Sequence, residues 1–230
     1  MGLRYTDLCM DDTTHQQKQY FEYAYRTGSD IWTHTPYWDT AEKMLPPMEK
    51  DSLVLDIGVG RGIWAMKMIE RGFKVLGIDY IESIVHKVNE TITKKGYADR
   101  ARCITASALN IPFHKQTFNM ATDIGILQHL QSRDWKKYTD ELVRVLKPAA
   151  YYLNISLSRR TGSFLGWRPN VENIGDYTKF GVHYHFFTEQ EITDIFENDF
   201  VIIDQHHESY DTHSDPQDDI VLVFTLMQKK

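Results

Sequence analysis

Cysteine is nearly absent from this chain, since only Cys9 and Cys103 occur and neither belongs to a metal-binding or redox spacing. Long apolar runs are also absent, and no stretch approaches the roughly 18 consecutive apolar residues that a membrane-spanning helix needs. The first 15 residues are polar, which disfavours a secretory signal. These absences lead us to expect a cytoplasmic protein in a reducing compartment, with no membrane association.

Clustered positive charge is scarce as well. The formal net charge is −6, and no run of lysine or arginine exceeds two residues. Nucleic-acid binding needs basic residues gathered on one face, so the composition disfavours DNA or RNA as a partner. The 230 residues, 42% hydrophobic and 25% charged, suffice for one globular domain and not for two. We therefore expect a single domain over residues 1–230, and the sequence does not indicate its oligomeric state.

What the chain does contain is a glycine-rich turn between an apolar stretch and a helical one. Residues 53–55 predict a short buried strand, Asp56 follows it, and glycines then occupy alternate positions at Gly58, Gly60 and Gly62. Residues 63–69 predict a helix after this turn. Without Cβ atoms in the turn, a ligand can approach the backbone closely and face the helix N-terminus.

Two classes of ligand use such a turn, and the spacing separates them. A dinucleotide fingerprint, G-x-G-x-x-G/A, would place glycine or alanine at position 63, where this chain has Ile63. Asp56 would also oppose a pyrophosphate, whereas a carboxylate suits a cationic group. An acid followed by G-x-G-x-G resembles the first motif of the class I S-adenosylmethionine-dependent methyltransferases. The resemblance implies that Asp56, Gly58, Gly60 and Gly62 hold the amino-acid end of the cofactor.

A second acid, Asp79, ends the next predicted strand over residues 73–79. In a doubly wound sheet neighbouring strands end at the same edge, so Asp79 is expected beside the glycine turn. A carboxylate there can accept both hydroxyls of a ribose, although a simpler role at the start of the following helix is compatible with this. The resemblance implies that Tyr80 or Ile81 flanks the adenine.

Further matches to small-molecule methyltransferases follow in order along the chain. Residues 111–113, Ile-Pro-Phe, precede a predicted strand at 118–123, and residues 124–130 resemble the family's Gly-Val-Leu-His-His-Leu. The chain departs from the family where Ser107 replaces an acid and where Pro-Ala-Ala at 148–150 replaces Pro-Gly-Gly. The resemblance implies two further sets of cofactor contacts. Ser107 and Ala108 would meet the adenine edge, and Asp123 and Ile124 would close the methionine side.

Two less regular segments are expected to enclose the site. Residues 1–48 are rich in aromatic side chains and form either a helix packed on the core or a lid over the cofactor, contacting it through Tyr20 and Trp32. Residues 157–187 form an insertion without clear periodicity. A long irregular segment in a compact domain is commonly functional, and the resemblance implies an acceptor-pocket wall rather than a purely structural excursion. Its candidate acceptor contacts are Trp167, His183 and Tyr184.

His129 is the candidate for acid–base chemistry, because it directly follows the fourth strand. A neutral imidazole there could remove a proton from the acceptor, with a rate that rises with pH through its titration; the alternative is a packed core histidine. His183 and His185 share a strand face but lack a third ligand at a telling spacing, so no metal is predicted. No G-x-S-x-G element suggests a hydrolase.

The resemblance implies an α/β, Rossmann-like fold: a seven-stranded, mostly parallel sheet with helices on both faces and an antiparallel last strand. The function expected from it is transfer of a methyl group from S-adenosyl-L-methionine to a small-molecule acceptor through O, N or S. Two alternatives stay open. One is a nicotinamide-dependent oxidoreductase, and the other is a non-catalytic regulatory protein that binds S-adenosylmethionine.

Overall fold

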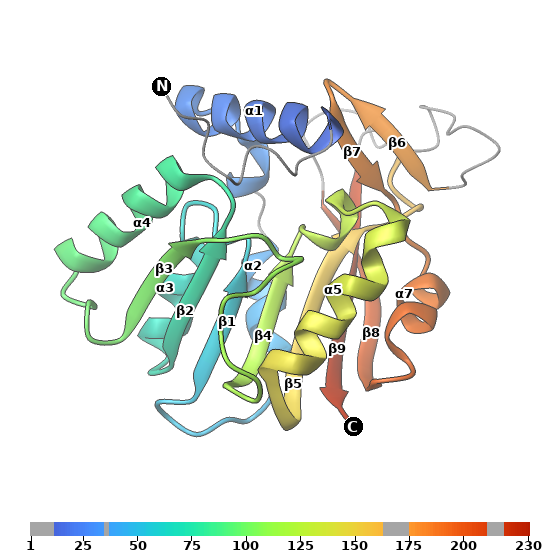
Figure 1. Ribbon diagram of the computed structural model, residues 1–230. Coiled ribbons are helices and arrows are strands. Elements are labelled where there is room, and N and C mark those ends of the chain that lie inside the picture. Colours follow the sequence, from blue (N-terminus) through green and yellow to red (C-terminus); the bar gives the residue numbers. More distant parts are fainter. Residues whose placement is uncertain (1–11, 35–36, 163–174, 211–218) are drawn as a thin grey trace.

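A seven-stranded sheet with helices on both faces forms the centre of the molecule (Figure 1). The computed structural model describes residues 12–34, 37–162, 175–210 and 219–230. Strands β3, β2, β1, β4 and β5 are mutually parallel, and β9 runs antiparallel to both β5 and β8. The predicted mostly parallel sheet with an antiparallel last strand is confirmed. In spatial order the strands are β3 (Ala101–Thr105), β2 (Lys74–Asp79), β1 (Leu53–Ile57), β4 (Phe118–Ile124), β5 (Leu146–Leu157), β9 (Ile220–Lys229) and β8 (Phe200–Tyr210).

The strand order reverses direction at β1. From β1 the chain builds outward through β2 to β3, and then returns to place β4 on the other side of β1. The carboxyl ends of these parallel strands lie along the upper edge of the sheet in Figure 1. In doubly wound sheets such a reversal opens a crevice between loops that diverge to opposite faces, and ligands bind there.

Each face of the sheet is covered by helices with an apolar side. Helices α2 (Trp38–Lys43), α3 (Ile63–Glu70) and α4 (Glu82–Lys94) pack on one face, and α5 (Ser132–Val145) and α7 (Glu189–Phe196) pack on the other. Helix α4 turns an apolar stripe toward the sheet, and the members of this stripe are all buried. Burial on both faces explains why the strands are near-continuous apolar runs. The buried residues of α4 are Ile84, Val85, Val88 and Ile92.

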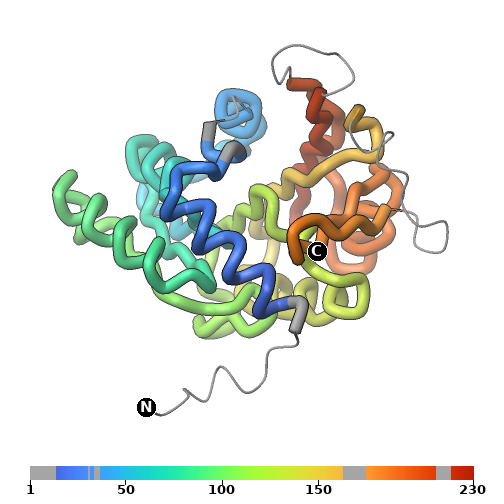
Figure 2. The backbone as a smooth tube through the Cα atoms, turned by 90° about the horizontal axis from the view of Figure 1, so that it is seen from above, coloured from blue at the N-terminus to red at the C-terminus, as the bar shows by residue number. Residues whose placement is uncertain are grey.

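Helix α1 (Asp12–Thr27) lies across the carboxyl edge of the sheet, as Figures 1 and 2 both show. It leads into the short 3-10 helix η1 (Ile31–His34). A two-stranded hairpin of β6 (Asp176–Lys179) and β7 (Val182–His185) lies beside α1. The insertion at 157–187 is therefore partly regular, although its sequence showed no periodicity.

The last third of the chain supplies helix α7 and the antiparallel end of the sheet. A capping box of Thr188 and Glu191 starts α7. Strand β8 includes His206 and His207, which pair with Phe224 and Val223 of β9. Among the described residues, no helix has the length and apolar character that crossing a membrane requires.

Candidate active site

A cavity of about 710 Å³ is lined by the loops at the carboxyl edge of the sheet and by side chains of α1. Its wall divides at the β1–β4 boundary. What we call the β1–β3 half is lined by residues within 56–64, 78–81 and 106–109. The β4–β9 half is lined by residues within 124–130, 155–161, 184–186 and 220–222. Side chains of α1 and η1 cover both halves, so one cavity can hold two ligands side by side.

The loop after β1 has a backbone that glycine adopts without strain. Gly58 and Gly60 line the cavity with φ angles of 75° and 49°. A Cβ atom on Gly58 would stand 2.1 Å from Cδ1 of Ile126, and one on Gly60 would stand 3.0 Å from the Tyr25 hydroxyl. The Gly58 N–H donates to the Ile78 carbonyl at 2.8 Å, which holds the loop against β2. The backbone of this loop therefore forms part of the cavity wall.

The third glycine of the motif has a different place. Gly62 is the N-cap of α3 with a φ angle of 76°, and it is not among the residues that line the cavity. A Cβ atom on Gly62 would lie 2.8 Å from Cγ1 of Val88 in α4. The structure thus relates Gly62 to the packing of α3 against α4, whereas the sequence motif had suggested a ligand contact.

Asp56 presents an unused oxygen to the site. The side chain is 3% exposed, and its Oδ1 accepts a hydrogen bond from the Thr122 hydroxyl at 3.1 Å. Its Oδ2 is buried without a hydrogen-bond partner in the part of the chain that the structure describes. Burial raises the pKa of Asp56 to about 7, and the charges of Asp79 and Asp123 add to the shift. A cationic N–H group on a ligand would satisfy this oxygen and favour its ionised form.

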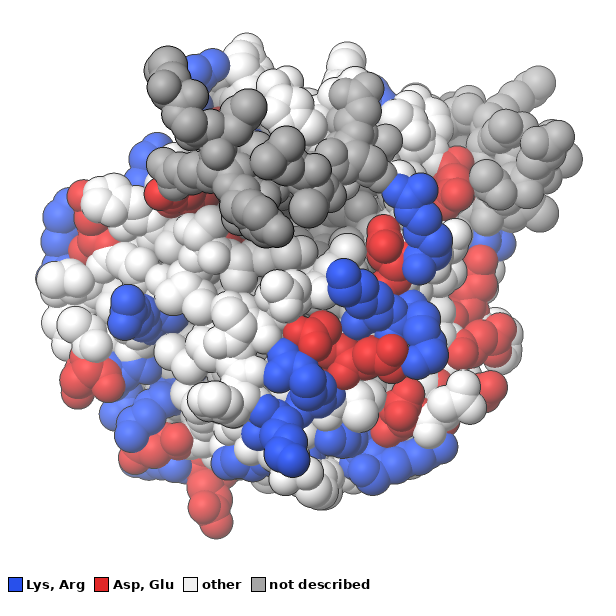
Figure 3. All heavy atoms as spheres, viewed as in Figure 1, with Lys and Arg blue, Asp and Glu red and all other residues white. Residues whose placement is uncertain are grey.

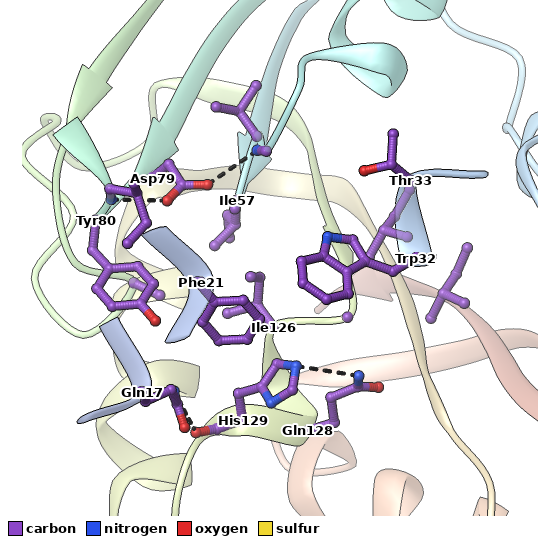
Figure 4. Close-up of a pocket in the computed structure, with 18 of the residues that line it drawn as sticks. Gln17, Phe21, Trp32, Thr33, Ile57, Asp79, Tyr80, Ile126, Gln128 and His129 are labelled. Atoms are coloured by element: carbon purple, nitrogen blue, oxygen red, sulfur yellow. Dashed lines mark hydrogen bonds between the residues drawn. The ribbon is translucent and has the colours of Figure 1, made fainter. Parts of the chain in front are cut away.

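Asp79 ends β2 and organises the backbone around it. Its Oδ2 accepts the Gly60 N–H at 3.0 Å and its Oδ1 accepts the Ile81 N–H at 2.9 Å (Figure 4). Burial raises the pKa of Asp79 to about 6, while these hydrogen bonds act in the opposite direction. A carboxylate has about four lone-pair positions, so both oxygens retain capacity for ligand hydroxyls. Asp79 therefore shapes the turn into α4 and still faces the cavity.

The other residues predicted for this side also line the β1–β3 half: Tyr80, Ile81, Ser107 and Ala108. The hydroxyl of Ser107 accepts the Leu109 N–H at 3.1 Å and so stabilises the turn after β3. A second acceptor site on that oxygen remains for a ligand, and the hydroxyl carries no negative charge.

Asp123 lies beneath the cavity and does not line it. It is fully buried, and its oxygens accept hydrogen bonds from the backbone N–H groups of Ile126 and Leu127 and from the hydroxyls of Tyr138 and Tyr152. Its role in the structure is to hold the turn that follows β4. The neighbouring Ile124, predicted together with Asp123, does line the cavity.

Aromatic side chains from the N-terminal segment cover the cavity. Tyr20 and Trp32, both predicted to contact the cofactor, line it, and so does Phe21. In Figure 4 the Phe21 ring lies between Trp32 and His129, with ring centroids 5.4 and 5.1 Å away respectively. The segment thus forms a wall of the site. Whether it moves as a lid stays a prediction.

An ion pair that the sequence analysis missed joins this segment to the glycine loop. Nε and Nη2 of Arg61 each lie 2.5 Å from an oxygen of Asp30, which is fully buried, and Nη2 donates to the Tyr25 carbonyl at 3.0 Å. The Thr33 hydroxyl donates to the same carboxylate at 2.6 Å. Although burial raises the pKa of Asp30, these hydrogen bonds bring it below its usual value. Because 31 positions separate the partners, no local spacing indicates the pair.

His129 lies in the 3-10 helix η2 (Leu127–His129), on the β4–β9 half of the cavity. Its Nδ1 lies 2.8 Å from the His183 carbonyl, and its Nε2 lies 3.4 Å from the side-chain amide nitrogen of Gln128 (Figure 4). Burial lowers the pKa of His129 to about 4, against the opposing effect of the His183 carbonyl. The imidazole is therefore neutral at pH 7, and the rise in rate expected from an ordinary histidine titration shifts to lower pH.

The predicted acceptor contacts divide three ways. Tyr184 lines the cavity, with its ring centroid 4.9 Å from that of His129. The His183 side chain does not line it, and its Nε2 lies 3.7 Å from the Asp176 carboxylate instead. Trp167 lies outside the described residues. Within the described segments, no group of three histidine, cysteine or acidic side chains could hold a metal ion.

Comparisons with known proteins agree with this geometry. Residues 54–149 match a family model described as a methyltransferase domain. The fold is shared with the Burkholderia thailandensis 1,6-didemethyltoxoflavin-N1-methyltransferase, crystallised with 1,6-didemethyltoxoflavin and S-adenosylhomocysteine. Its TM-score is 0.75 at 18% identity, over 94% of this chain and 88% of that one.

Curated relatives share a shorter region. Demethylmenaquinone methyltransferase of Lactiplantibacillus plantarum is 30% identical over 110 residues, which are 46% of this chain and 45% of that protein. An Arabidopsis thaliana tRNA (carboxymethyluridine(34)-5-O)-methyltransferase is 26% identical over 61% of this chain and 33% of its own length. The chain thus spans between a third and a half of these two relatives. The matched domain, the strand order and the acids beside the glycine loop agree on one conclusion: residues 54–149 form a methyltransferase domain, within a fold of the class I S-adenosylmethionine-dependent type.

Proposed function

We propose that the protein transfers a methyl group from S-adenosylmethionine to a small-molecule acceptor through O, N or S. The observation that carries this proposal is the buried Oδ2 of Asp56, which lacks a partner among the described residues and lies beside the glycine loop. A ligand with a cationic amino group would supply the missing donor. A pyrophosphate would instead place negative charge against a buried acid.

The β1–β3 half fits the cofactor group by group. Asp56 would hold the ammonium group, the backbone at Gly58 and Gly60 would allow close approach, and Asp79 would accept the ribose hydroxyls. The adenine would lie against Tyr80 and Ile81, with Ser107 and Ala108 at its edge. When bound, S-adenosylmethionine supplies a methyl group on a positively charged sulfur, ready for attack by a nucleophile.

The β4–β9 half would hold the acceptor in line with that methyl group. A lone pair on the acceptor's O, N or S atom forms the new bond to the methyl carbon as the carbon–sulfur bond breaks, and its electron pair stays on sulfur. Alignment supplies much of the rate in such a displacement. His129 would orient the acceptor and accept its proton at Nε2, the nitrogen that faces Gln128.

A small acceptor is favoured by charge and by the cavity wall. On the face shown in Figure 3, lysines and arginines lie among acids and form no continuous basic surface. The covering side chains of α1 and η1 include the aromatic rings of Tyr20, Phe21, Tyr25 and Trp32, which suit an organic molecule better than a polyanion. The tRNA methyltransferase among the relatives makes RNA the acceptor to test against.

The test separates this proposal from the two alternatives. Calorimetric titration with S-adenosylhomocysteine and with NAD should give binding of the first and none of the second; the reverse result would support an oxidoreductase. Incubation with methyl-tritiated S-adenosylmethionine should then label small organic acceptors. Cofactor binding without transfer to any acceptor of a broad panel would support a regulatory protein, and efficient labelling of bulk tRNA would contradict a small acceptor.

A further inference from the structure

We infer that the acceptor is an uncharged, planar ring compound that presents a hydrogen-bond donor and a hydrogen-bond acceptor on adjacent atoms, as the N–H and C=O edge of a lactam does. This inference rests on the proposed function and specifies the class of its acceptor. It follows from two side chains of the β4–β9 half, Gln128 and His129, whose polar atoms are fixed by the main chain.

The main chain sets the orientation of the Gln128 amide. The Leu157 N–H at the end of β5 donates to Oε1 of Gln128 at 2.8 Å. Only the oxygen of the amide can accept this hydrogen bond, so the oxygen faces β5 and the NH2 group points the other way. Gln128 lines the cavity, and its Nε2 is therefore a hydrogen-bond donor within the β4–β9 half.

The main chain also sets the tautomer of His129. Nδ1 lies 2.8 Å from the His183 carbonyl in β7, and a carbonyl oxygen can only accept. The proton of the neutral ring is therefore on Nδ1, and Nε2 carries a lone pair. Gln17 of α1 supports this arrangement, because its Nε2 donates to the His129 carbonyl at 3.4 Å and its Oε1 accepts the His183 N–H at 3.1 Å.

The cavity wall thus displays one donor and one acceptor side by side. Gln128 Nε2 and His129 Nε2 lie 3.4 Å apart and, without a ligand, form a hydrogen bond to each other (Figure 4). A ligand that breaks this bond must replace it at both atoms, or leave a buried polar group unsatisfied. Adjacent C=O and N–H groups meet both requirements: the carbonyl accepts from Gln128 while the N–H donates to His129.

The surroundings of this pair specify the rest of the ligand. Aromatic rings of Phe21 and Tyr184 lie edge-on to His129, at centroid distances of 5.1 and 4.9 Å. The only acids among the described lining residues, Asp56 and Asp79, belong to the β1–β3 half. Lys179 lines the cavity as well, with its ammonium group 5.5 Å from the centre of the exposed Phe180 ring. Flat apolar walls with no carboxylate in the β4–β9 half favour a planar molecule without positive charge.

Three probes of one shape test the inference: 2-quinolone, which has the donor–acceptor edge, and 1-methyl-2-quinolone and 2-methoxyquinoline, which lack the donor. Each is titrated into the protein saturated with S-adenosylhomocysteine. We expect 2-quinolone to bind about 10- to 100-fold more tightly than either methylated compound, because these leave His129 Nε2 unsatisfied.

Gln128→Glu supplies the matching change in the protein. The carboxylate can keep the hydrogen bond to Leu157 but presents an acceptor where the amide presents a donor, so the preference for 2-quinolone should fall to about threefold or less. Gln190→Glu adds the same charge at an exposed site on α7, and it should retain the full preference. Melting temperature and S-adenosylhomocysteine affinity, measured on each preparation, confirm that the variants are folded.

The outcomes are distinct. Failure of S-adenosylhomocysteine to bind the wild type would contradict the proposed function itself. Normal S-adenosylhomocysteine binding with equal affinity for the three probes, or with no binding of any of them, would overturn the inference alone. Tighter binding of quinoline-2-carboxylate than of 2-quinolone would also overturn it, because the acceptor site would then prefer an anion.

Discussion

Asp56, Asp79 and Asp123 close three parallel strands at one edge of the sheet, yet their hydrogen-bond partners differ. Asp123 accepts from four donors of the protein, and Asp79 accepts from two backbone N–H groups. Asp56 alone among the three has a buried oxygen with no partner in the described residues. Ligand binding should therefore depend on the ionisation of Asp56 more than on that of its neighbours.

Asp56→Asn should weaken S-adenosylhomocysteine binding roughly 10- to 150-fold, because a hydrogen bond to a charged group contributes about 1.5–3 kcal/mol. The amide can still accept from Thr122, so the fold should persist. Calorimetry on this variant and on Asp140→Asn, an exposed carboxylate paired with Lys136, separates the local effect from general loss of charge. Unchanged affinity in a folded Asp56→Asn protein would remove Asp56 from the cofactor site.

The same residue should make binding pH-dependent. With a pKa of about 7, Asp56 is largely protonated in the free protein at pH 6, and binding a cationic amino group favours its ionised form. Affinity should rise from pH 5.5 to 8, and binding near pH 6.5 should release a proton. Calorimetry in two buffers of different ionisation enthalpy measures that proton. Asp56→Asn should show a flat profile with no release, and a wild type that behaves likewise would contradict this assignment.

His129 is expected to stay neutral over the working pH range. Because burial lowers its pKa to about 4, NMR should show the tautomer protonated at Nδ1 from pH 8 down to about pH 5. His129→Asn should leave S-adenosylhomocysteine affinity unchanged and lower single-turnover rates by on the order of 10²–10⁴. A folded His129→Asn protein with full turnover would leave His129 only a packing role.

The sequence could indicate a site residue only where its role depends on residues a few positions away. The acids and glycines of the β1–β3 half lie next to strand ends, so a pattern over a few positions was enough to find them. Gln128 and the Arg61–Asp30 pair acquire their roles from partners 29 to 31 positions away. Asp123 and Gly62 show the opposite limitation. Both stand at motif positions, but the motif does not tell that Asp123 lies outside the cavity wall or that Gly62 packs against Val88.

At the scale of elements, the Arg61–Asp30 ion pair connects the N-terminal segment to the glycine loop. Asp30→Asn removes a fully buried charge, whereas Asp39→Asn removes an 80% exposed one that lies 3.4 Å from Lys67. We expect the first change to destabilise the protein by about 1–3 kcal/mol and the second by less than about 0.5 kcal/mol.

Hydrogen exchange locates this effect. Amides of residues 12–34 should exchange faster in Asp30→Asn than in the wild type, while those of β1 and β4 should not. Bound S-adenosylhomocysteine should reduce the difference, because the ligand would lie against Tyr25 and Trp32. Equal exchange in Asp30→Asn and Asp39→Asn would show that the ion pair does not fasten the segment.

Elements outside the central sheet were harder to predict. Strands β6 and β7 have four residues each and contain polar side chains on their buried side, so their sequence lacks alternation. His185 is buried there because its Nδ1 is 2.6 Å from Asp176 across the hairpin. Likewise His207 continues β8 with its Nδ1 2.6 Å from Glu189 of α7. In both cases an acid from another element offsets the cost of burying a histidine, and the composition of the strand does not reveal this pairing.

At the scale of the whole molecule, the buried acids predict how stability varies with pH. The pKa values of Asp56, Asp79 and Asp123 are raised in the folded state to about 7, 6 and 6, mainly by burial. The folded state thus binds more protons than the unfolded chain between about pH 4 and 7, so these acids lower the free energy of unfolding as pH rises through that window. Three histidines act in the opposite direction below about pH 6.5, because burial lowers the pKa of His129 to about 4 and also lowers the pKa values of His183 and His207.

Asp56 has the highest pKa of the three acids, so its ionisation should lower the melting temperature of the ligand-free protein as pH rises from 5.5 to 8. The difference between the wild type and Asp56→Asn isolates this effect, because the histidines contribute equally to both proteins. In scanning calorimetry the wild type should gain less melting temperature across this range than Asp56→Asn, or lose more, and saturating S-adenosylhomocysteine should reduce the difference by stabilising the ionised carboxylate. Equal dependence on pH in the two proteins would contradict the raised pKa of Asp56.

The fold as a whole was predictable because its signals repeat: apolar strands alternate with amphipathic helices, and an acid or glycine marks several strand ends. The acceptor could not be specified to the same depth. The β4–β9 half is assembled from four stretches of chain that are distant in sequence, together with α1. No single stretch carries its shape, and the relation of Gln128 to His129 exists only in three dimensions.

The separation of the cavity into halves affects how this protein can diversify. Contacts proposed for the cofactor come from residues 56–109, whereas Tyr184 and the carbonyl that orients His129 come from the β6–β7 hairpin. Substitutions in the hairpin can therefore retune which molecules are methylated without altering the acids proposed to hold the methyl donor. New substrate preferences are accessible to this architecture through small changes far along the chain from its signature motif.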